Sequence, residues 1–509
     1  MFRSFHLTAR ALTIAIGIVP LIASTASAQQ KEPYPGFDAF VTRAMADAKV
    51  PGAAVAIVRN DSVIYTRGYG VREVGKPDRI DDRTLFEIGS ATKTFTSTLV
   101  GILQTEGKMR LDDRISVHLP DFRMYDAYAN AEVTVRDALS HRTGLNRGEL
   151  AWLGSGVSRA EILRRLRFQA PATSFRSAFA YNNPMFLAAG EAAGRAGKST
   201  WEDLVQERIL TPLGMTESVP VVKDFSRYTN AAMPHANGPS GPLSQRHMPL
   251  DNIAPAGSIV SSARDMAQWL RFQMGDGTFN GKRIISTAVL RDLHTPQMVI
   301  RGGGGGGGGG GQGDGVARLN TYGLGWFIAD YRGRVQWHHG GNTDGMTTAQ
   351  GMLPTEKIGV VVLSNLDHTN LPEVVLRYVF DRHLKLPEET VAQRQGGGGG
   401  GGGGNPNAQT AASAPTAPAL PLEAYVGTYA DSLFGEATVT IQDGKLMTVR
   451  GDLKGTMEHL NRDNFRWTTD VAVLPPIPVE FHIGADGRAT ALSLGIQGDI
   501  RRFGRKSAR

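Results

Sequence analysis

Residues 85–93 read LFEIGSATK, and this stretch decides the fold and the chemistry that we expect. Ser90 follows a glycine and opens an apparent helix, in which Phe95 and Leu99 lie on one apolar stripe. Residues three apart share a helix face, so Lys93 is expected one turn beyond Ser90. The stretch therefore predicts a serine and a lysine side by side at the start of a helix.

This pairing suits a serine nucleophile. A buried ammonium near a helix N-terminus is disfavoured, and the lowered pKa makes the Lys93 amine a usable base. The backbone N–H groups of the same N-terminus can stabilise an oxyanion. The alternative is an N-cap serine beside a solvated lysine. Ser90 is the only serine in the chain with lysine three residues later, which favours the catalytic interpretation.

Residues 85–93 resemble the active-site segment of the class C β-lactamase-related hydrolases, a family that includes penicillin-binding proteins, esterases and D-amino-acid peptidases. LSHRTGL at 139–145, within the segment 134–145, resembles the next recurring segment of that family. The likeness runs from about residue 35 to 386. It implies an α/β (α+β) fold of the β-lactamase/transpeptidase type.

The distribution of strand and helix patterns agrees with that fold. Strand-like segments lie at both ends of the region and helical patterns lie between them, which predicts an antiparallel sheet flanked by helices with a mainly helical insertion. The expected strands are 53–58 and 62–66, joined as a hairpin, then 335–338, 347–353 and 357–364, and clear helices are expected at 262–273 and 372–384.

The second motif of the family is Tyr-x-Asn, which occurs here at Tyr128, Tyr181 and Tyr228. The family spacing selects Tyr181, because it lies some 90 residues beyond the serine, and Tyr128 and Tyr228 are then expected to be structural. By resemblance, Tyr181 shares the base role with Lys93 as a phenolate favoured by the lysine cation. Asn183 would bind a substrate amide or orient the lysine. The alternatives are a buried, hydrogen-bonded tyrosine and an N-cap role for Asn183.

The third motif is HGGNTDG at 339–345, which resembles the His-x-Gly version found in family esterases. By resemblance, His339 contacts the substrate, Gly341 completes the motif, and the N–H groups of Asn342 and Ser90 form the oxyanion hole. A shift of one residue, starting at His338, and a glycine-rich turn with surface histidines are the alternatives. A mostly neutral imidazole replaces a lysine that grips a substrate carboxylate, which favours ester or D-amino-acid peptide hydrolysis over β-lactam hydrolysis.

The N-terminus is typical of a secretory signal peptide over residues 1–28. Arg3 and Arg10 give a positive start, an apolar run covers 11–23, and Ala-Ser-Ala at 26–28 supplies a small-residue cleavage site. We therefore expect a periplasmic or secreted protein without a membrane anchor after cleavage. The chain has no cysteine, which excludes disulfides and a thiol nucleophile.

Two glycine runs divide the remaining chain. We expect a hydrolase domain at 29–390 with a flexible glycine loop at 302–315, a Gly/Pro/Ala linker at 391–420, and a small all-β domain at 421–509. The last resembles lipocalin-like β domains of unknown function. A ligand role, packing beside the catalytic cleft and simple stabilisation are all open for it.

These features predict acyl transfer through an ester on Ser90, with a small-molecule ester, amide or peptide as substrate and with no metal or cofactor. The net charge is +7, and the basic residues are scattered except at 501–509, which we interpret as a solvated tail, so no nucleic-acid partner is expected. Two other hypotheses are a penicillin-binding-type protein that acylates but turns over slowly, and a non-catalytic binding module carried by the β domain.

Overall fold

The structure of the protein is a computed structural model. It describes residues 1, 31–221, 225–301, 319–386, 416–471, 474, 476–496 and 499–507. Glu32–Arg509 forms one compact unit. The expected signal peptide (apart from Met1), the glycine loop 302–315 and most of the linker lie outside the described residues.

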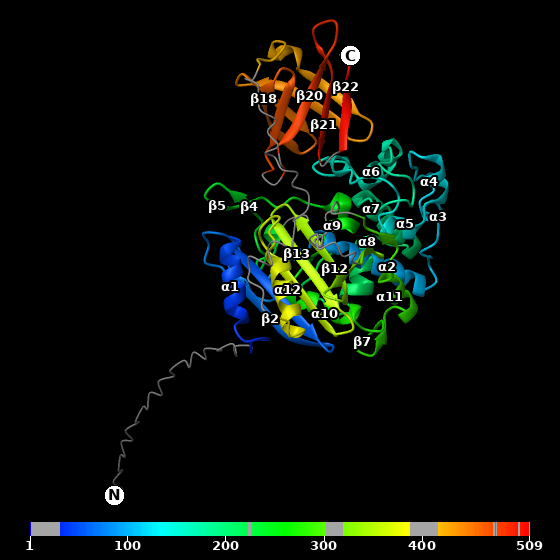
Figure 1. The fold of residues 1–509 in the computed structure, drawn as a ribbon, viewed down its shortest axis with the longest axis vertical. Coiled ribbons are helices and arrows are strands. Elements are labelled where there is room, and N and C mark those ends of the chain that lie inside the picture. The colour runs from blue at the N-terminus through cyan, green and yellow to red at the C-terminus, as the bar shows by residue number, and fades with distance from the viewer. Residues whose placement is uncertain are drawn as a thin grey trace. The chain divides into compact units, whose positions relative to one another are not determined.

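In the described residues, the centre of the region before the linker is an antiparallel sheet of eight strands (Figure 1). Their spatial order is β2 (Ser62–Gly70), β1 (Gly52–Arg59), β14 (Ile358–Ser364), β13 (Met346–Leu353), β12 (Arg334–Thr343), β11 (Phe327–Tyr331), β10 (Asn320–Tyr322) and β9 (Met298–Val299). The expected strands are confirmed, but 335–338 was too short a prediction, because β12 continues through its two glycines to Thr343.

Both faces of this sheet are covered by helices. On β1, Ala54, Ala56 and Val58 face one hydrophobic core, whereas Val55 and Ile57 face another. Successive side chains of a strand point to opposite faces, so a strand buried on both sides is apolar throughout, as this one is. One face is covered by α1 (Phe37–Asp47) and α12 (Leu371–His383), and α10 (Ala263–Gln273) packs on the other.

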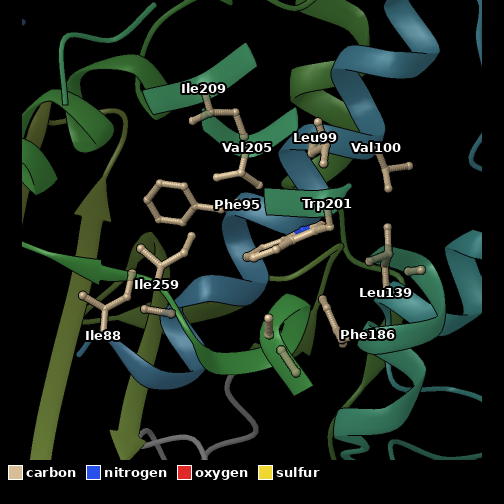
Figure 2. Packing of buried hydrophobic residues seen from close by; sticks show 14 of the residues in the cluster. Ile88, Phe95, Leu99, Val100, Leu139, Phe186, Trp201, Val205, Ile209 and Ile259 are labelled. Carbon is tan, nitrogen blue, oxygen red and sulfur yellow. The ribbon is translucent and has the colours of Figure 1, made fainter. Parts of the chain in front are cut away.

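The nucleophile helix α2 (Thr92–Thr105) runs through the larger core. Phe95 stacks on Trp269 of α10 with ring centroids 3.7 Å apart. Leu99 and Phe95 also lie in the cluster around Trp201 (Figure 2). Burial on several sides fixes the axis of α2, and this placement determines where Ser90 and Lys93 lie.

A mainly helical insertion lies between β2 and β9, as expected. Its other helices are α3 (Ile115–His118), α4 (Ala127–Glu132), α5 (Val135–Leu139), α6 (Arg159–Arg165), α7 (Asn183–Gly197), α8 (Trp201–Val205), α9 (Ala254–Gly257) and α11 (Thr287–Leu293). Three two-stranded ribbons accompany them, β3 (Phe86–Glu87) with β6 (Val260–Ser261), β4 (His235–Gly238) with β5 (Gly241–Ser244), and β7 (Thr278–Phe279) with β8 (Lys282–Arg283). None of the helices in the described residues combines the length and hydropathy that a membrane span requires.

The C-terminal region is a closed antiparallel barrel, which confirms the expected all-β domain. Its strands are β15 (Gly427–Asp431), β16 (Gly435–Gln442), β17 (Lys445–Arg450), β18 (Leu453–Asn461), β19 (Asn464–Thr469), β20 (Ile477–Ile483), β21 (Ala489–Ile496) and β22 (Asp499–Arg505). The interpretation of 501–509 as a solvated tail was wrong for the residues in β22. There Arg501 and Arg505 donate hydrogen bonds to backbone carbonyls, including those of Phe168 and Ala424.

Candidate active site

Ser90 lies in a single 3₁₀ turn, Gly89–Ala91, that leads into α2. Gly89 has a φ of 51°, and a Cβ there would come within 2.8 Å of the backbone nitrogen of Asn342. Only glycine accepts both the left-handed backbone and the close approach of β12. The turn therefore places a partly exposed Ser90 against the backbone of that strand.

Lys93 is fully buried directly beneath the serine. Its Nζ lies 2.9 Å from Ser90 Oγ and donates a hydrogen bond to the carbonyl of Ala256 at 2.8 Å. Burial lowers the pKa of Lys93 well below its ordinary value, the nearby Arg147 charge lowers it further, and Glu149 opposes them. This shift favours the neutral amine, the form that can take the serine proton.

Tyr181 completes this group from the other side. Its hydroxyl shares a hydrogen bond with the Ser90 side chain, and Lys93 Nζ lies 4.9 Å from its ring centroid. Burial raises the pKa of Tyr181 to about 12, although Arg147 and the bond from Ser90 oppose the increase. The resting tyrosine thus keeps its proton at neutral pH, and the base role that the resemblance implied for it stays a prediction. The other two Tyr-x-Asn tyrosines are elsewhere, with Tyr128 exposed on α4 and Tyr228 beside Phe225.

Asn183 faces the same site from the first turn of α7. The residue that caps this helix is Asn182, whose side chain accepts a hydrogen bond from the Met185 N–H at 2.8 Å, so the N-cap alternative for Asn183 was wrong. Asn183 Nδ2 instead donates to the two carboxylate oxygens of Glu149 at 3.3 and 3.2 Å. Within the described residues its buried Oδ1 has no hydrogen-bond partner.

The strand register places His339, not His338, on the catalytic face of β12. His339 shares its face with Gly341, where a Cβ would lie 1.9 Å from the Ile88 carbonyl oxygen and 2.9 Å from the Ser90 nitrogen. His338 points to the opposite face, toward the charges of α12. Both histidines are buried, so the alternative of surface histidines in a turn was wrong. The backbone at 341–342 therefore abuts the nucleophile, as an oxyanion hole requires.

Both ring nitrogens of His339 have partners in the protein. Nδ1 donates to the Gly340 carbonyl at 2.6 Å, so Nε2 accepts the hydrogen bond from the Tyr322 hydroxyl at 3.0 Å. Burial, together with the adjacent Lys93, lowers the pKa of His339 to about 3. His339 is therefore a neutral imidazole, and its contact with substrate stays a prediction.

The structure adds three residues that sequence reasoning missed. His141 packs its ring 4.1 Å from the Tyr181 ring, and its Nδ1 accepts the Asn182 N–H at 3.0 Å. The Arg147 guanidinium lies 4.8 Å from the Tyr181 ring centroid. Glu149 Oε1 accepts from Arg147 Nε at 2.7 Å. His141 lay inside the recurring segment 139–145, whereas the other two had no sequence signal.

In the part of the chain that the structure describes, no three His, Asp or Glu side chains are grouped so that they could hold a metal ion. The groups around Ser90 are a buried amine, a protonated phenol and the strand backbone at 341–342. Such a set can activate a hydroxyl nucleophile, stabilise an oxyanion and return a proton to a leaving group.

Comparison with known proteins agrees with this arrangement. The β-lactamase family model matches residues 37–383, and a domain of unknown function, DUF3471, matches residues 411–504. The unguisins hydrolase ungD of Aspergillus violaceofuscus is 27% identical, over 90% of this chain and 87% of its own. Protein flp of Staphylococcus aureus is 24% identical over 66% of this chain, which spans 64% of flp.

Solved structures share the fold. The octameric penicillin-binding protein homologue from Pyrococcus abyssi superposes with a TM-score of 0.61 at 21% identity, covering 92% of this chain and 99% of that one. SurE superposes with a TM-score of 0.56 at 21% identity, covering 92% and 98%. Together with the family match over most of the sequence, these findings show that the chain belongs to the β-lactamase family of serine hydrolases and carries a C-terminal barrel of the DUF3471 type.

Proposed function

We propose that this protein is an exported hydrolase that cleaves small esters or D-amino-acid peptides through a covalent ester on Ser90. One observation carries the proposal. Ser90 Oγ is hydrogen-bonded both to a buried Lys93 amine at 2.9 Å and to the Tyr181 side chain. A nucleophile needs an adjacent base within this reach, and burial holds the lysine in its basic form.

The proposed reaction begins when the Lys93 amine takes the Ser90 proton as Oγ bonds to the substrate carbonyl carbon. The N–H groups of Ser90 and Asn342 stabilise the resulting oxyanion. As the bond to the leaving group breaks, the Lys93 proton reaches that group through the Tyr181 hydroxyl. A water then loses a proton to the same amine, attacks the ester and releases Ser90 with its proton restored.

The neutral His339 supports the choice of substrate class. An uncharged imidazole cannot hold a substrate carboxylate as a lysine cation would, so esters and D-amino-acid peptides are favoured over β-lactams. The free Asn183 Oδ1 suits a substrate N–H. Hydrolytic turnover, rather than binding alone, also agrees with the name of the relative ungD as an unguisins hydrolase.

The first test is intact-mass spectrometry of the mature protein mixed with p-nitrophenyl butyrate, ampicillin or a fluorophosphonate. We expect one adduct on Ser90 with steady nitrophenol release, and its loss in Ser90→Ala but not in the control Ser62→Ala, at an exposed position of β2. A persistent ampicillin adduct without turnover would favour the penicillin-binding-type alternative. Absence of an adduct with every probe, or unimpaired activity of Ser90→Ala, would contradict the proposal.

Export is tested separately. We expect the protein that leaves the cytoplasm to begin at Gln29, which N-terminal sequencing of the secreted or periplasmic fraction measures. Recovery of only cytoplasmic protein that retains residues 1–28 would contradict this part of the proposal.

A further inference from the structure

The loop of residues 147–154 contributes to the catalytic site at its first end. Arg147 covers the Tyr181 ring, and Glu149 holds both Arg147 Nε and Asn183 Nδ2. Glu149 is buried, whereas one third of the Arg147 side chain is exposed. The 147–154 loop therefore sets the position of two groups on the Tyr181 side of Ser90.

The other end of the same loop is built into the barrel. Leu150 and Ala151 belong to the barrel's hydrophobic core together with Leu453. A Cβ at Gly154 would come within 2.5 Å of the Leu453 side chain, and the Gly154 carbonyl accepts the Asp452 N–H at 2.8 Å. These contacts show that the loop and the barrel are closely packed against each other.

Arg450, at the end of β17, is the polar centre of this junction. Its side chain is 2% exposed, and its guanidinium donates to the carbonyls of Leu150, Leu153 at 3.3 Å and Phe434 at 3.0 Å. The Asp431 carboxylate acts on it electrostatically but makes no hydrogen bond with it among the described residues. Burial lowers the pKa of Arg450 to about 10, which shows how unfavourable this environment is for a cation. Burying an arginine that bonds only carbonyls costs free energy of folding. In return, the guanidinium holds these carbonyls in fixed positions.

We propose that the C-terminal barrel positions the Tyr181 side of the catalytic site, and that Arg450 is the positioning residue that acts through the 147–154 loop. This inference rests on the proposed function, and it assigns a role to a domain for which none is known. The path runs from Arg450 to the Leu150 carbonyl, then through the neighbouring Glu149 to Arg147, whose guanidinium lies against the Tyr181 ring. It ends at the phenol, which shares a hydrogen bond with Ser90.

The groups around Lys93 fix the direction of the expected effect. Arg147 lowers and Glu149 raises the pKa of Lys93, with Arg147 the stronger of the two, while His141, His339 and Tyr181 are uncharged at neutral pH. When the loop loses its anchor, Arg147 and Glu149 move away together, and because Arg147 has the larger influence of the two, the Lys93 pKa rises. Because the neutral amine is the active form, the ascending limb of the pH profile must then shift to higher pH.

The test compares Arg450→Met and Arg450→Lys with the parent chain on p-nitrophenyl butyrate. Arg450→Met should lower kcat/KM by about tenfold to hundredfold, since small misplacements of catalytic groups have effects of this size. The ascending limb of its pH profile should move to higher pH. Arg450→Lys should recover part of the lost kcat/KM and should reverse part of this pH shift. The matched control is Arg466→Met, which removes an exposed arginine from β19 of the same barrel and should change neither.

Folding and function are separated by two further measurements. Thermal unfolding shows whether Arg450→Met retains the barrel, and where it does not, Arg450→Lys and Leu453→Ala take its place. Unchanged kcat, KM and pH profile in folded Arg450 variants would overturn this inference while leaving the proposed function intact. Failure of the parent chain to label Ser90 would instead overturn the proposed function.

Discussion

The turn that carries Ser90 and Lys93 and the 147–154 loop both contribute to one site, but they are specified in different ways. The turn is local, because the i, i+3 spacing of a helix brings its two functional side chains together. The loop is held by residues some 300 positions away in the sequence, such as Arg450. The catalytic pair is thus encoded by neighbouring residues, whereas its electrostatic environment depends on tertiary structure.

The largest expected effect concerns the turn that carries Ser90 and Lys93. Lys93→Met should lower kcat by about 10⁴-fold, because it removes the amine that lies 2.9 Å from Ser90 Oγ and takes its proton in the proposed reaction. Steady-state kinetics on p-nitrophenyl butyrate measures the loss. Lys108→Met is the control, since Lys108 lies on the surface and pairs with Glu106. Comparable losses in both variants would show that lysine replacement acts through stability.

The next effect concerns the contact between β12 and the nucleophile turn. Gly341→Ala should lower kcat by about 10²–10³-fold, because its Cβ would collide with the Ile88 carbonyl and push the oxyanion-binding backbone away from Ser90. Gly340→Ala on the same strand is the control, as its nearest neighbour would be the Thr348 carbonyl oxygen at 3.3 Å. Full activity of Gly341→Ala would rule out this placement of the oxyanion hole.

Tyr181→Phe should have a smaller effect, a loss of about 10²-fold in kcat with little change in KM. The ring and its packing against His141 remain, and only the hydroxyl that returns the proton is removed. Tyr128→Phe, at an exposed position, should behave like the parent. A variant at Tyr181 that turns over normally would mean that Lys93 delivers the proton directly.

The smallest effect concerns the electrostatic environment of Lys93, which depends on tertiary structure. Two substitutions in the 147–154 loop should shift the pH profile in opposite directions. Arg147→Gln removes a charge that lowers the Lys93 pKa, so the ascending limb of kcat/KM should move to higher pH. Glu149→Gln removes a charge that raises it, so the limb should move to lower pH. Shifts in the same direction in both variants would show that displacement of the loop, rather than the loss of a charge, changes the pKa of Lys93.

The sequence predicts those parts of the site that depend on short-range pattern. Ser90 and Lys93 follow from helix spacing, and the sheet and the barrel follow from alternating apolar segments. Choosing between Asn182 and Asn183 as the helix cap required the actual backbone, because either side chain can accept the N–H. Arg147 and Glu149 had no signal, since nothing in a loop sequence shows that a distant barrel will fix it beside Tyr181.

The length of β12 shows the same limit. The expected strand covered only residues 335–338, and glycine in a strand interior weakens it. In the structure the strand continues, because the bare backbone at Gly341 is what lets β12 lie against Ile88 and Ser90. The exception occurs where the site needs close approach of two backbones.

The central claim is that Lys93 is a neutral amine that activates Ser90. The rate of Ser90 labelling by a fluorophosphonate, followed by intact mass across the pH range, tests it most directly. We predict a rate that reaches its plateau well below pH 10, because burial keeps the Lys93 pKa well below its ordinary value. A rate that climbs steadily to about pH 10, where an ordinary lysine loses its proton, would contradict the account.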